Sequence, residues 1–159
     1  MRRLWECSDW NTFLENNRRK GVRLRFDKDV DDEVRRASKE FVNWLRRRYD
    51  FPMRVPIYFK ASRTIRSLDG EEVSATFFGP YDKTLEPYIR IAVGDYKDLL
   101  DERGKDNALG AILHSVAHEL SHYFQWIKDY NFLEERCERQ ARYYASEILY
   151  DYAEVREHP

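Results

Sequence analysis

The residues whose types and spacing most clearly suggest chemistry form the run His118-Glu119-Leu120-Ser121-His122. Two histidines four positions apart on a helix lie one turn from each other on the same face, so His118 and His122 can point their imidazoles at one ion. From the next position around the helix, Glu119 can reach a water on that ion without ligating the metal. Zinc lowers the pKa of bound water to about 7, and Glu119 would take the proton and pass it to a leaving amine. The spacing predicts a zinc centre that hydrolyses peptide bonds.

A catalytic zinc ion usually has three protein ligands and one open position, so a third ligand is expected elsewhere in the chain. The candidates are Glu134, Glu135 and Glu138, with Asp129 and Cys137 as weaker ones. Glu138 is favoured because the pattern of its helix places it on the buried face, where an unpaired carboxylate is costly. The small Ala141, one turn later, would allow this helix to approach the histidine helix closely. Glu134 is the reserve candidate.

Two long amphipathic helices are predicted to carry these residues. The first is capped by Asp106 or Asn107 and ends near Lys128. Apolar residues at spacings of three and four mark its buried face, namely Leu109, Leu113, Val116, Leu120, Phe124 and Ile127. The second covers about residues 132–155, and its buried face is marked by Cys137, Ala141, Ala145, Ile148 and Tyr152. The histidines lie off the first apolar face, as ligands that face an ion should.

Upstream of these helices the sequence predicts a small sheet and further helices. The predicted helices cover about residues 9–20, 30–48 and 95–104, and the predicted strands cover about residues 22–26, 55–61, 64–68, 72–78 and 88–93. Asp69-Gly70 is typical of a type I′ hairpin turn, in which both central residues need positive φ. The order of helices and strands indicates an α+β domain.

Length and composition favour a single domain over residues 1–159. Lys plus Arg (28) nearly equal Asp plus Glu (29), so no nucleic-acid partner is expected. The only cysteines, Cys7 and Cys137, match no disulfide spacing. The N-terminus lacks the apolar core of a signal peptide, and no apolar run approaches the roughly 20 residues that span a bilayer. These features predict a cytoplasmic protein without membrane contact.

The two long helices together resemble the ImmA/IrrE-like metallopeptidases, compact members of the gluzincin group. That family couples His-Glu-x-x-His to a downstream helix reading Glu-x-x-Ala-x-x-aromatic-Ala-x-x-aliphatic-Leu. The segment from Glu138 to Leu149 is similar at every marked position, and the resemblance covers roughly residues 88–149. It implies that His118, His122 and Glu138 are the zinc ligands and that Glu119 is the general base.

The resemblance also implies a fold and a substrate. The expected fold is a zincin-like domain with a small, mostly antiparallel sheet packed on the active-site helix and the C-terminal helix. The strand from Tyr88 to Val93 would lie beside the cleft, where an extended substrate could add as a further strand. Relatives commonly cleave helix-turn-helix repressors, so the expected substrate is a protein or peptide, such as a transcriptional repressor or an antitoxin.

The same residues are compatible with two other functions. The first is a zinc-binding regulatory or interaction protein that keeps the gluzincin fold with little or no proteolytic turnover, because the sequence does not identify an oxyanion donor among Tyr88, Tyr123, Tyr130 and Tyr144. The second is a SprT-like protease that acts at DNA. It is weaker because no cysteine-rich zinc ribbon follows the catalytic region and the charge is balanced.

Two further histidines are not assigned to the zinc site. His114 with His118 would be an alternative ligand pair, but His114 and His122 lie about 12 Å apart along a helix, so all three cannot easily share one ion. His114 is expected to pack or to support the site from outside. His158 is expected to be exposed near the C-terminus.

Overall fold

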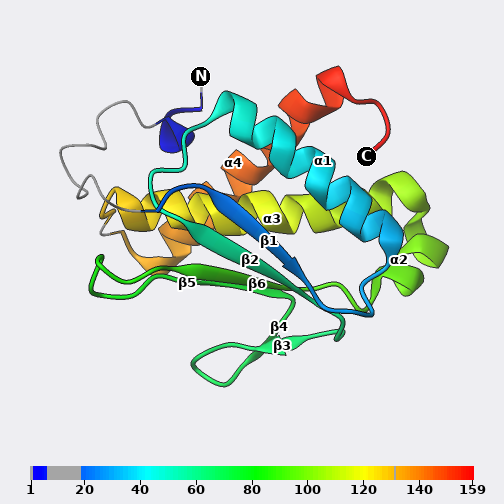
Figure 1. The fold of residues 1–159 in the computed structure, drawn as a ribbon, viewed down its shortest axis with the longest axis horizontal. Helices are drawn as coiled ribbons and strands as arrows, with labels where there is room; N and C mark the ends of the chain where they lie inside the picture. Colours follow the sequence, from blue (N-terminus) through cyan, green and yellow to red (C-terminus); the bar gives the residue numbers. More distant parts are fainter. Residues whose placement is uncertain (1, 7–18, 131) are drawn as a thin grey trace.

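The computed structural model describes residues 2–6, 19–130 and 132–159. Its helices are the short 3₁₀ helix η1 (Arg3–Trp5), α1 (Asp32–Arg48), α2 (Tyr96–Arg103), α3 (Lys105–Ile127) and α4 (Glu134–Val155). Its strands are β1 (Val22–Phe26), β2 (Val55–Lys60), β3 (Ile65–Arg66), β4 (Glu72–Val73), β5 (Ala75–Phe78) and β6 (Tyr88–Ala92). These elements confirm the predicted α+β class (Figure 1). Most of the helix predicted over residues 9–20 falls outside the described residues.

A four-stranded sheet with the order β1-β2-β6-β5 forms one layer of the molecule. The pairs β1/β2 and β2/β6 are parallel, and only β6/β5 is antiparallel. The expectation of a mostly antiparallel sheet is therefore wrong. The reason lies in the connections, because α1 joins β1 to β2 as a crossover, which returns the chain to the same end of the sheet and makes the two strands parallel.

The strand predicted beside the cleft, residues 88–93, is internal to the sheet. It corresponds to β6, which pairs with β2 on one side and with β5 on the other. It therefore has no free edge to which a substrate could add, and that expectation is wrong. The free edge on this side of the sheet belongs to β5.

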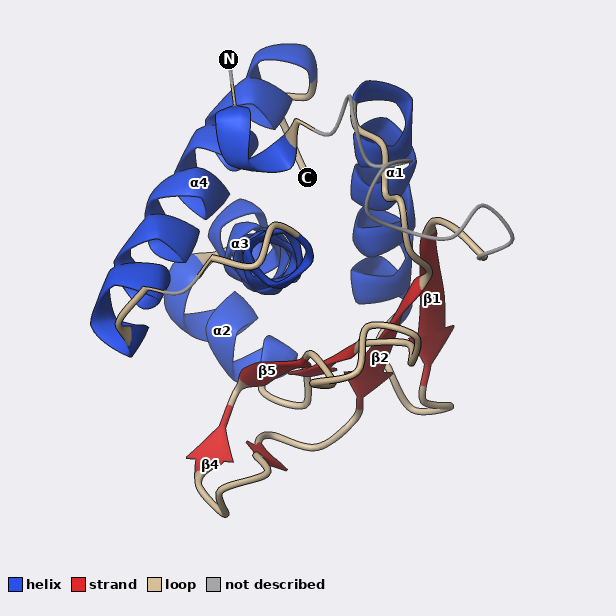
Figure 2. Cartoon of the chain, turned by 90° about the vertical axis from the view of Figure 1, so that its left-hand side faces the viewer, coloured by secondary structure: helices blue, strands red, loops and turns tan. Residues whose placement is uncertain are grey.

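The four α-helices lie on one face of the sheet, with α3 between α1 and α4 (Figure 2). α3 contacts α1, α2, α4, β5, β6 and η1, so the helix with the histidine pair is the central element of the fold. All six apolar residues that predicted its buried face are buried. Among the described residues, no helix is long and apolar enough to cross a membrane.

The hairpin between β3 and β4 is a separate two-stranded sheet, and its turn differs from the prediction. Gly70 has φ 89°, but Asp69 does not have a positive φ, so the type I′ assignment is wrong. The Gly70 N–H donates to the Ser67 carbonyl at 3.0 Å, and the Ser67 N–H donates to the Glu71 carbonyl at 2.9 Å. The Ser67 hydroxyl also donates to the Asp69 carboxylate. These bonds favour a wider loop that needs positive φ only at glycine.

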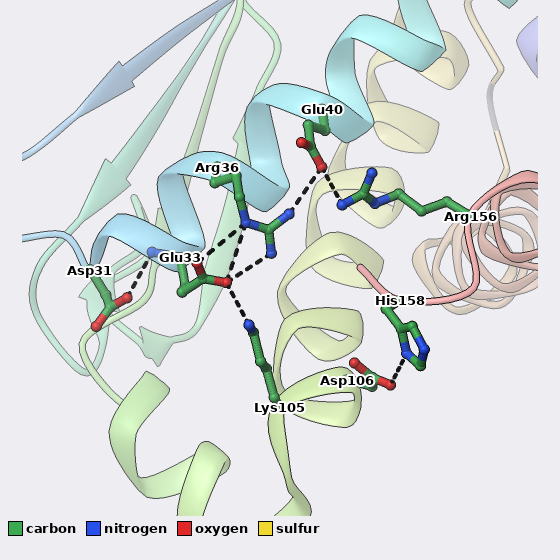
Figure 3. A network of polar contacts seen from close by, with 8 residues as sticks. All are labelled: Asp31, Glu33, Arg36, Glu40, Lys105, Asp106, Arg156 and His158. Atoms are coloured by element: carbon green, nitrogen blue, oxygen red, sulfur yellow. Dashed lines mark hydrogen bonds and ion pairs between the residues drawn. The ribbon is translucent and has the colours of Figure 1, made fainter.

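Polar contacts tie α1 to the start of α3 and to the C-terminal tail (Figure 3). Glu33 of α1 contacts both Arg36 and Lys105, and Glu40 contacts Arg156 at 2.8 Å. The tail also reaches α3, because His158 donates to Asp106 at 2.8 Å. These contacts join α1 to the start of α3, and they hold the C-terminal tail against both helices.

The start of α3 differs from the prediction by one turn or less. Gly104, with φ 81°, is the N-cap, and the helix begins at Lys105. The predicted caps have other partners, since Asp106 accepts from His158 and the Asn107 amide donates to the Arg103 carbonyl. The same Gly104 ends α2, so one residue with positive φ separates the two helices.

Candidate metal centre

His118, His122 and Glu138 come together between α3 and α4. Glu138 Oε2 lies 3.0 Å from His118 Nε2, and Glu138 Oε1 lies 2.9 Å from His122 Nε2. One ligand atom from each residue lies within 4.8 Å of the other two. Glu138 lies 16 residues after His122 in the sequence, yet its side chain meets those of His118 and His122, and the three could hold a metal ion.

The donor set suits zinc. Zinc is bound by histidine nitrogen and carboxylate oxygen at about 2 Å, and tetrahedral coordination then separates adjacent donor atoms by about 3.3 Å. Each histidine Nε2 faces a different oxygen of the Glu138 carboxylate, at 3.0 and 2.9 Å, so the donor atoms lie close enough together to share one ion. Two imidazoles and one carboxylate leave a fourth position for water or substrate, as catalytic zinc sites do.

Gln125 fixes the orientation of His122. The Gln125 side-chain nitrogen donates to the Cys137 carbonyl at 2.9 Å and to Gln140 Oε1 at 2.8 Å, so its oxygen faces His122 Nδ1, 2.8 Å away. A carbonyl oxygen can only accept, and His122 Nδ1 must therefore carry the proton. The lone pair of His122 then lies on Nε2, the nitrogen that faces Glu138.

Glu119 is buried beside the centre and is not one of the three clustered residues. It is only 6% exposed, yet it lines the cleft at the metal centre. Burial in the first place, and then the nearby charge of Glu138, raise the pKa of the Glu119 carboxyl to about 8 in the metal-free protein. A carboxyl group whose pKa lies near neutrality can both accept and return a proton.

The side chains of His118 and His122 are both largely buried. Burial, followed by the positive charge that His122 would carry, lowers the pKa of His118, while Glu138 opposes this shift. Neutral imidazole is the form that binds a metal. The arrangement therefore favours the ligand form of His118 near neutral pH.

Glu138 was favoured from the sequence for its burial, and that reason is wrong. Its side chain is 46% exposed. The helix face of Ala141 and Ala145 is buried as predicted, but Glu138 and Cys137, at the start of α4, are only partly buried because they border a cleft. The position of Glu138 one turn before Ala141 still brings its carboxylate to both histidines.

The other candidate ligands do not join the cluster. Glu134 and Cys137 line the cleft, Glu135 is exposed, and the carboxylate of Asp129 pairs with Lys83 at 3.2 Å. None of them belongs to a group of three potential ligands among the residues that the structure describes. The geometry thus favours Glu138 over Glu134.

His114 and His158 lie outside the cluster. His114 Nε2 lies 3.3 Å from the Ser146 hydroxyl on α4, one helical turn before His118, and so it supports the packing of α3 on α4. His158 is exposed and pairs with Asp106. Neither histidine contacts Glu138 in the described structure.

The four tyrosines considered as oxyanion donors have different surroundings. The Tyr123 hydroxyl is buried and already bonds both the N–H and the carbonyl of Met53. Tyr88 packs against Phe78, and Tyr144 is partly buried against the core. Tyr130 is 37% exposed and is the tyrosine among the described residues that lines the cleft.

A cleft of about 560 Å³ opens onto the centre. Its walls are the hairpin loop and β5 on the sheet side and α3 and α4 on the helix side, and Glu119, His122 and Glu138 lie among its lining residues. β5 contributes Ala75, Thr76 and Phe77. The free edge strand of the sheet therefore lines the same cleft as His122 and Glu138.

The sequence matches no protein-family model, and it has no significant similarity to a curated protein. The resemblance to ImmA/IrrE-like metallopeptidases therefore rests on the motifs of α3 and α4.

Proposed function

We propose that this protein is a zinc-dependent endopeptidase. The observation that carries the proposal is the convergence of Glu138 on His118 and His122, at 3.0 and 2.9 Å, beside a cleft that Glu119, His122 and Glu138 line. Zinc at these three residues would polarise the scissile carbonyl and make a bound water acidic near neutral pH. The motif resemblance of α3 and α4 supports the same function.

Glu119 is the general base in this proposal. Glu119 follows His118 in the sequence and lines the cleft. Its carboxylate takes the proton of the attacking water and then gives it to the leaving amine. Its burial raises the pKa of the carboxyl, which favours holding the proton before it passes to the leaving amine. Gln125 holds the protonation state of His122, so that Nε2 stays available as a ligand.

The substrate is proposed to bind as an extended segment along β5. β5 pairs only with β6 among the described strands, so one row of its backbone N–H and carbonyl groups is unpaired within the sheet. An extended peptide can add to such an edge by main-chain hydrogen bonds. The resemblance implies a helix-turn-helix repressor or an antitoxin as the natural substrate.

Cleavage by the wild-type protein and by Glu119→Gln tests the proposal. Both proteins are loaded with zinc and incubated with an unfolded protein mixture and with candidate repressors, and the fragments are identified by mass spectrometry. We expect the wild type to cut and Glu119→Gln to bind zinc equally but to cut at least about a thousandfold more slowly. Equal cleavage by the variant would overturn the role of Glu119. A wild type that holds zinc and cuts nothing would favour the regulatory protein without turnover.

A further inference from the structure

The cleft at the metal centre is lined by five carboxylates and by no lysine or arginine among the described residues. Glu119 and Glu138 are accounted for by the proposed function. The others are Asp69 and Glu71 from the hairpin loop and Glu134 from the first turn of α4. A divalent cation would balance the charges of Glu119 and Glu138 only, which leaves the remaining three carboxylates uncompensated.

These three carboxylates have no cationic partner in the described structure. No ion pair joins Asp69, Glu71 or Glu134 to a lysine, arginine or histidine among those residues, whereas the neighbouring Glu72 pairs with Arg66 at 3.7 Å. The ammonium group of Lys83 lies 5.5 Å from the ring of Trp126, which lines the cleft. Lys83 pairs with the carboxylate of Asp129 and not with one of these three. The cleft therefore has a negative potential that can attract a positively charged ligand.

The three carboxylates are not a second metal site. Among the described residues, only His118, His122 and Glu138 form a group of three potential ligands close enough to share an ion. Carboxylates that are spread over a cleft attract a mobile positive charge without chelating it.

The buried carboxyl of Glu119 is a second sign, beside the three carboxylates, that the cleft receives a ligand. It is 6% exposed, it lines the cleft, and no side chain or backbone group of the described residues hydrogen-bonds to it. Buried polar groups are nearly always hydrogen-bonded in a working protein. The partner of Glu119 therefore reaches it through the cleft, as a water or as a group of a bound ligand.

We propose that the cleft selects peptide segments with a Lys or Arg side chain within a few residues of the cleaved bond, and that Asp69, Glu71 and Glu134 make this selection. The inference rests on the proposed function, because it names the substrate class of the same site. The cleft also offers apolar and aromatic surface at Phe77 and Trp126, on which the long stem of a basic side chain can pack. An acidic peptide would instead meet repulsion from all three carboxylates.

Peptide binding tests the selection without turnover. Zinc-loaded Glu119→Gln is titrated into two short fluorescent peptides, which are rich in alanine and threonine and differ only in carrying two arginines or two glutamates. We expect the arginine peptide to bind about tenfold more tightly at low salt and the difference to shrink at about 0.5 M salt. Equal affinities at low salt would overturn the proposal.

A matched pair of variants locates the selection. Glu134 and Glu135 are adjacent in the first turn of α4, but only Glu134 lines the cleft. In the same background, Glu134→Lys should reduce the preference for the arginine peptide severalfold, and adding Glu71→Lys should abolish it, while Glu135→Lys should leave it unchanged. An equal loss in Glu135→Lys would show a general charge effect and would overturn the assignment to the cleft.

Cleavage of a mixed-sequence peptide library by the zinc-loaded wild type separates the two proposals. Enrichment of Lys or Arg beside the cleaved bond supports both of them. Cleavage without such enrichment overturns the selection and keeps the peptidase. No cleavage, together with a retained preference for the arginine peptide, overturns the peptidase and keeps the selectivity of the cleft.

Discussion

The side-chain oxygen of Gln125 lies 2.8 Å from His122 Nδ1, three residues earlier on the same helix. The Gln125 nitrogen donates to the Cys137 carbonyl, one residue before Glu138 in α4. One amide therefore sets both the tautomer of His122 and the position of α4 against α3. The geometry of the candidate ligands depends on a residue that is not itself a ligand.

Replacing Gln125 should weaken zinc binding. Gln125→Leu removes the acceptor for His122 Nδ1 and both bonds to α4, and a lost partner of a metal-bound histidine typically costs about 10- to 100-fold in metal affinity. Gln125→Glu keeps the acceptor and should recover part of the affinity. Competition with a chromophoric chelator measures both variants. Unchanged affinity in Gln125→Leu would contradict this role.

Ser121 should contribute to stability through the N-terminal segment. The Trp5 indole N–H donates to the Ser121 hydroxyl at 3.0 Å, and both side chains are buried. Ser121→Ala removes this buried hydrogen bond and should lower the free energy of unfolding by about 1–3 kcal/mol. Urea unfolding measures the change. The control is Ser115→Ala, whose hydroxyl bonds only its own helix at Ala111, and an equal loss there would contradict the prediction.

The pair of Arg2 and Asp151 should make stability depend on acid pH. Arg2 Nε and Nη2 donate to the Asp151 carboxylate at 2.9 and 2.8 Å, and these hydrogen bonds hold the pKa of Asp151 below its usual value. A carboxyl group with a lowered pKa in the folded protein stabilises it above about pH 4, and that contribution disappears as the pH falls through the folded-state pKa.

Asp151→Asn should therefore be less stable than the wild type at neutral pH, and the difference should narrow as the pH falls below about 4. Thermal unfolding over a pH series measures this. Glu154→Gln, an exposed change on the same helix, should follow the wild type throughout. A constant difference between Asp151→Asn and the wild type at every pH would argue against the ion pair as the cause.

Tyr130 is the phenol that should assist cleavage. It lines the cleft, and its hydroxyl is available to donate to the oxygen of a tetrahedral intermediate. Tyr130→Phe should lower kcat by about 10²-fold with little change in KM or zinc content. Tyr143→Phe is the control because Tyr143 is exposed on α4 and does not line the cleft. A Tyr130→Phe variant with normal kcat would exclude this donor.

The helical half of the fold could be predicted well from the sequence because its signals are local. The apolar residues of α3 recur with helical spacing, and glycine at position 104 ends one helix and begins another. The metal-binding cluster followed from the same spacing, since His118 and His122 share one face. The third candidate ligand, Glu138, was chosen for a burial that the structure does not show and from the family motif, yet its carboxylate does lie beside both histidines.

The sheet was harder to predict because strand pairing is not local. Residues 72–78 look like one strand, but Glu72 and Val73 pair with β3, whereas Ala75 to Phe78 pair with β6. Only the three-dimensional pairing shows that the free edge belongs to β5. Gln125 was missed for a related reason, because its role depends on a carbonyl of α4 that no spacing within α3 reveals.

Zinc binding by three proteins tests the central claim most directly. The wild type, Glu138→Ala and Glu134→Ala are stripped of metal, titrated with zinc by calorimetry and then analysed for bound metal. The wild type and Glu134→Ala should each bind one zinc ion tightly, and Glu138→Ala should lose at least about 100-fold in affinity because two imidazoles remain. Full zinc affinity in Glu138→Ala, or no zinc binding by the wild type, would contradict the account.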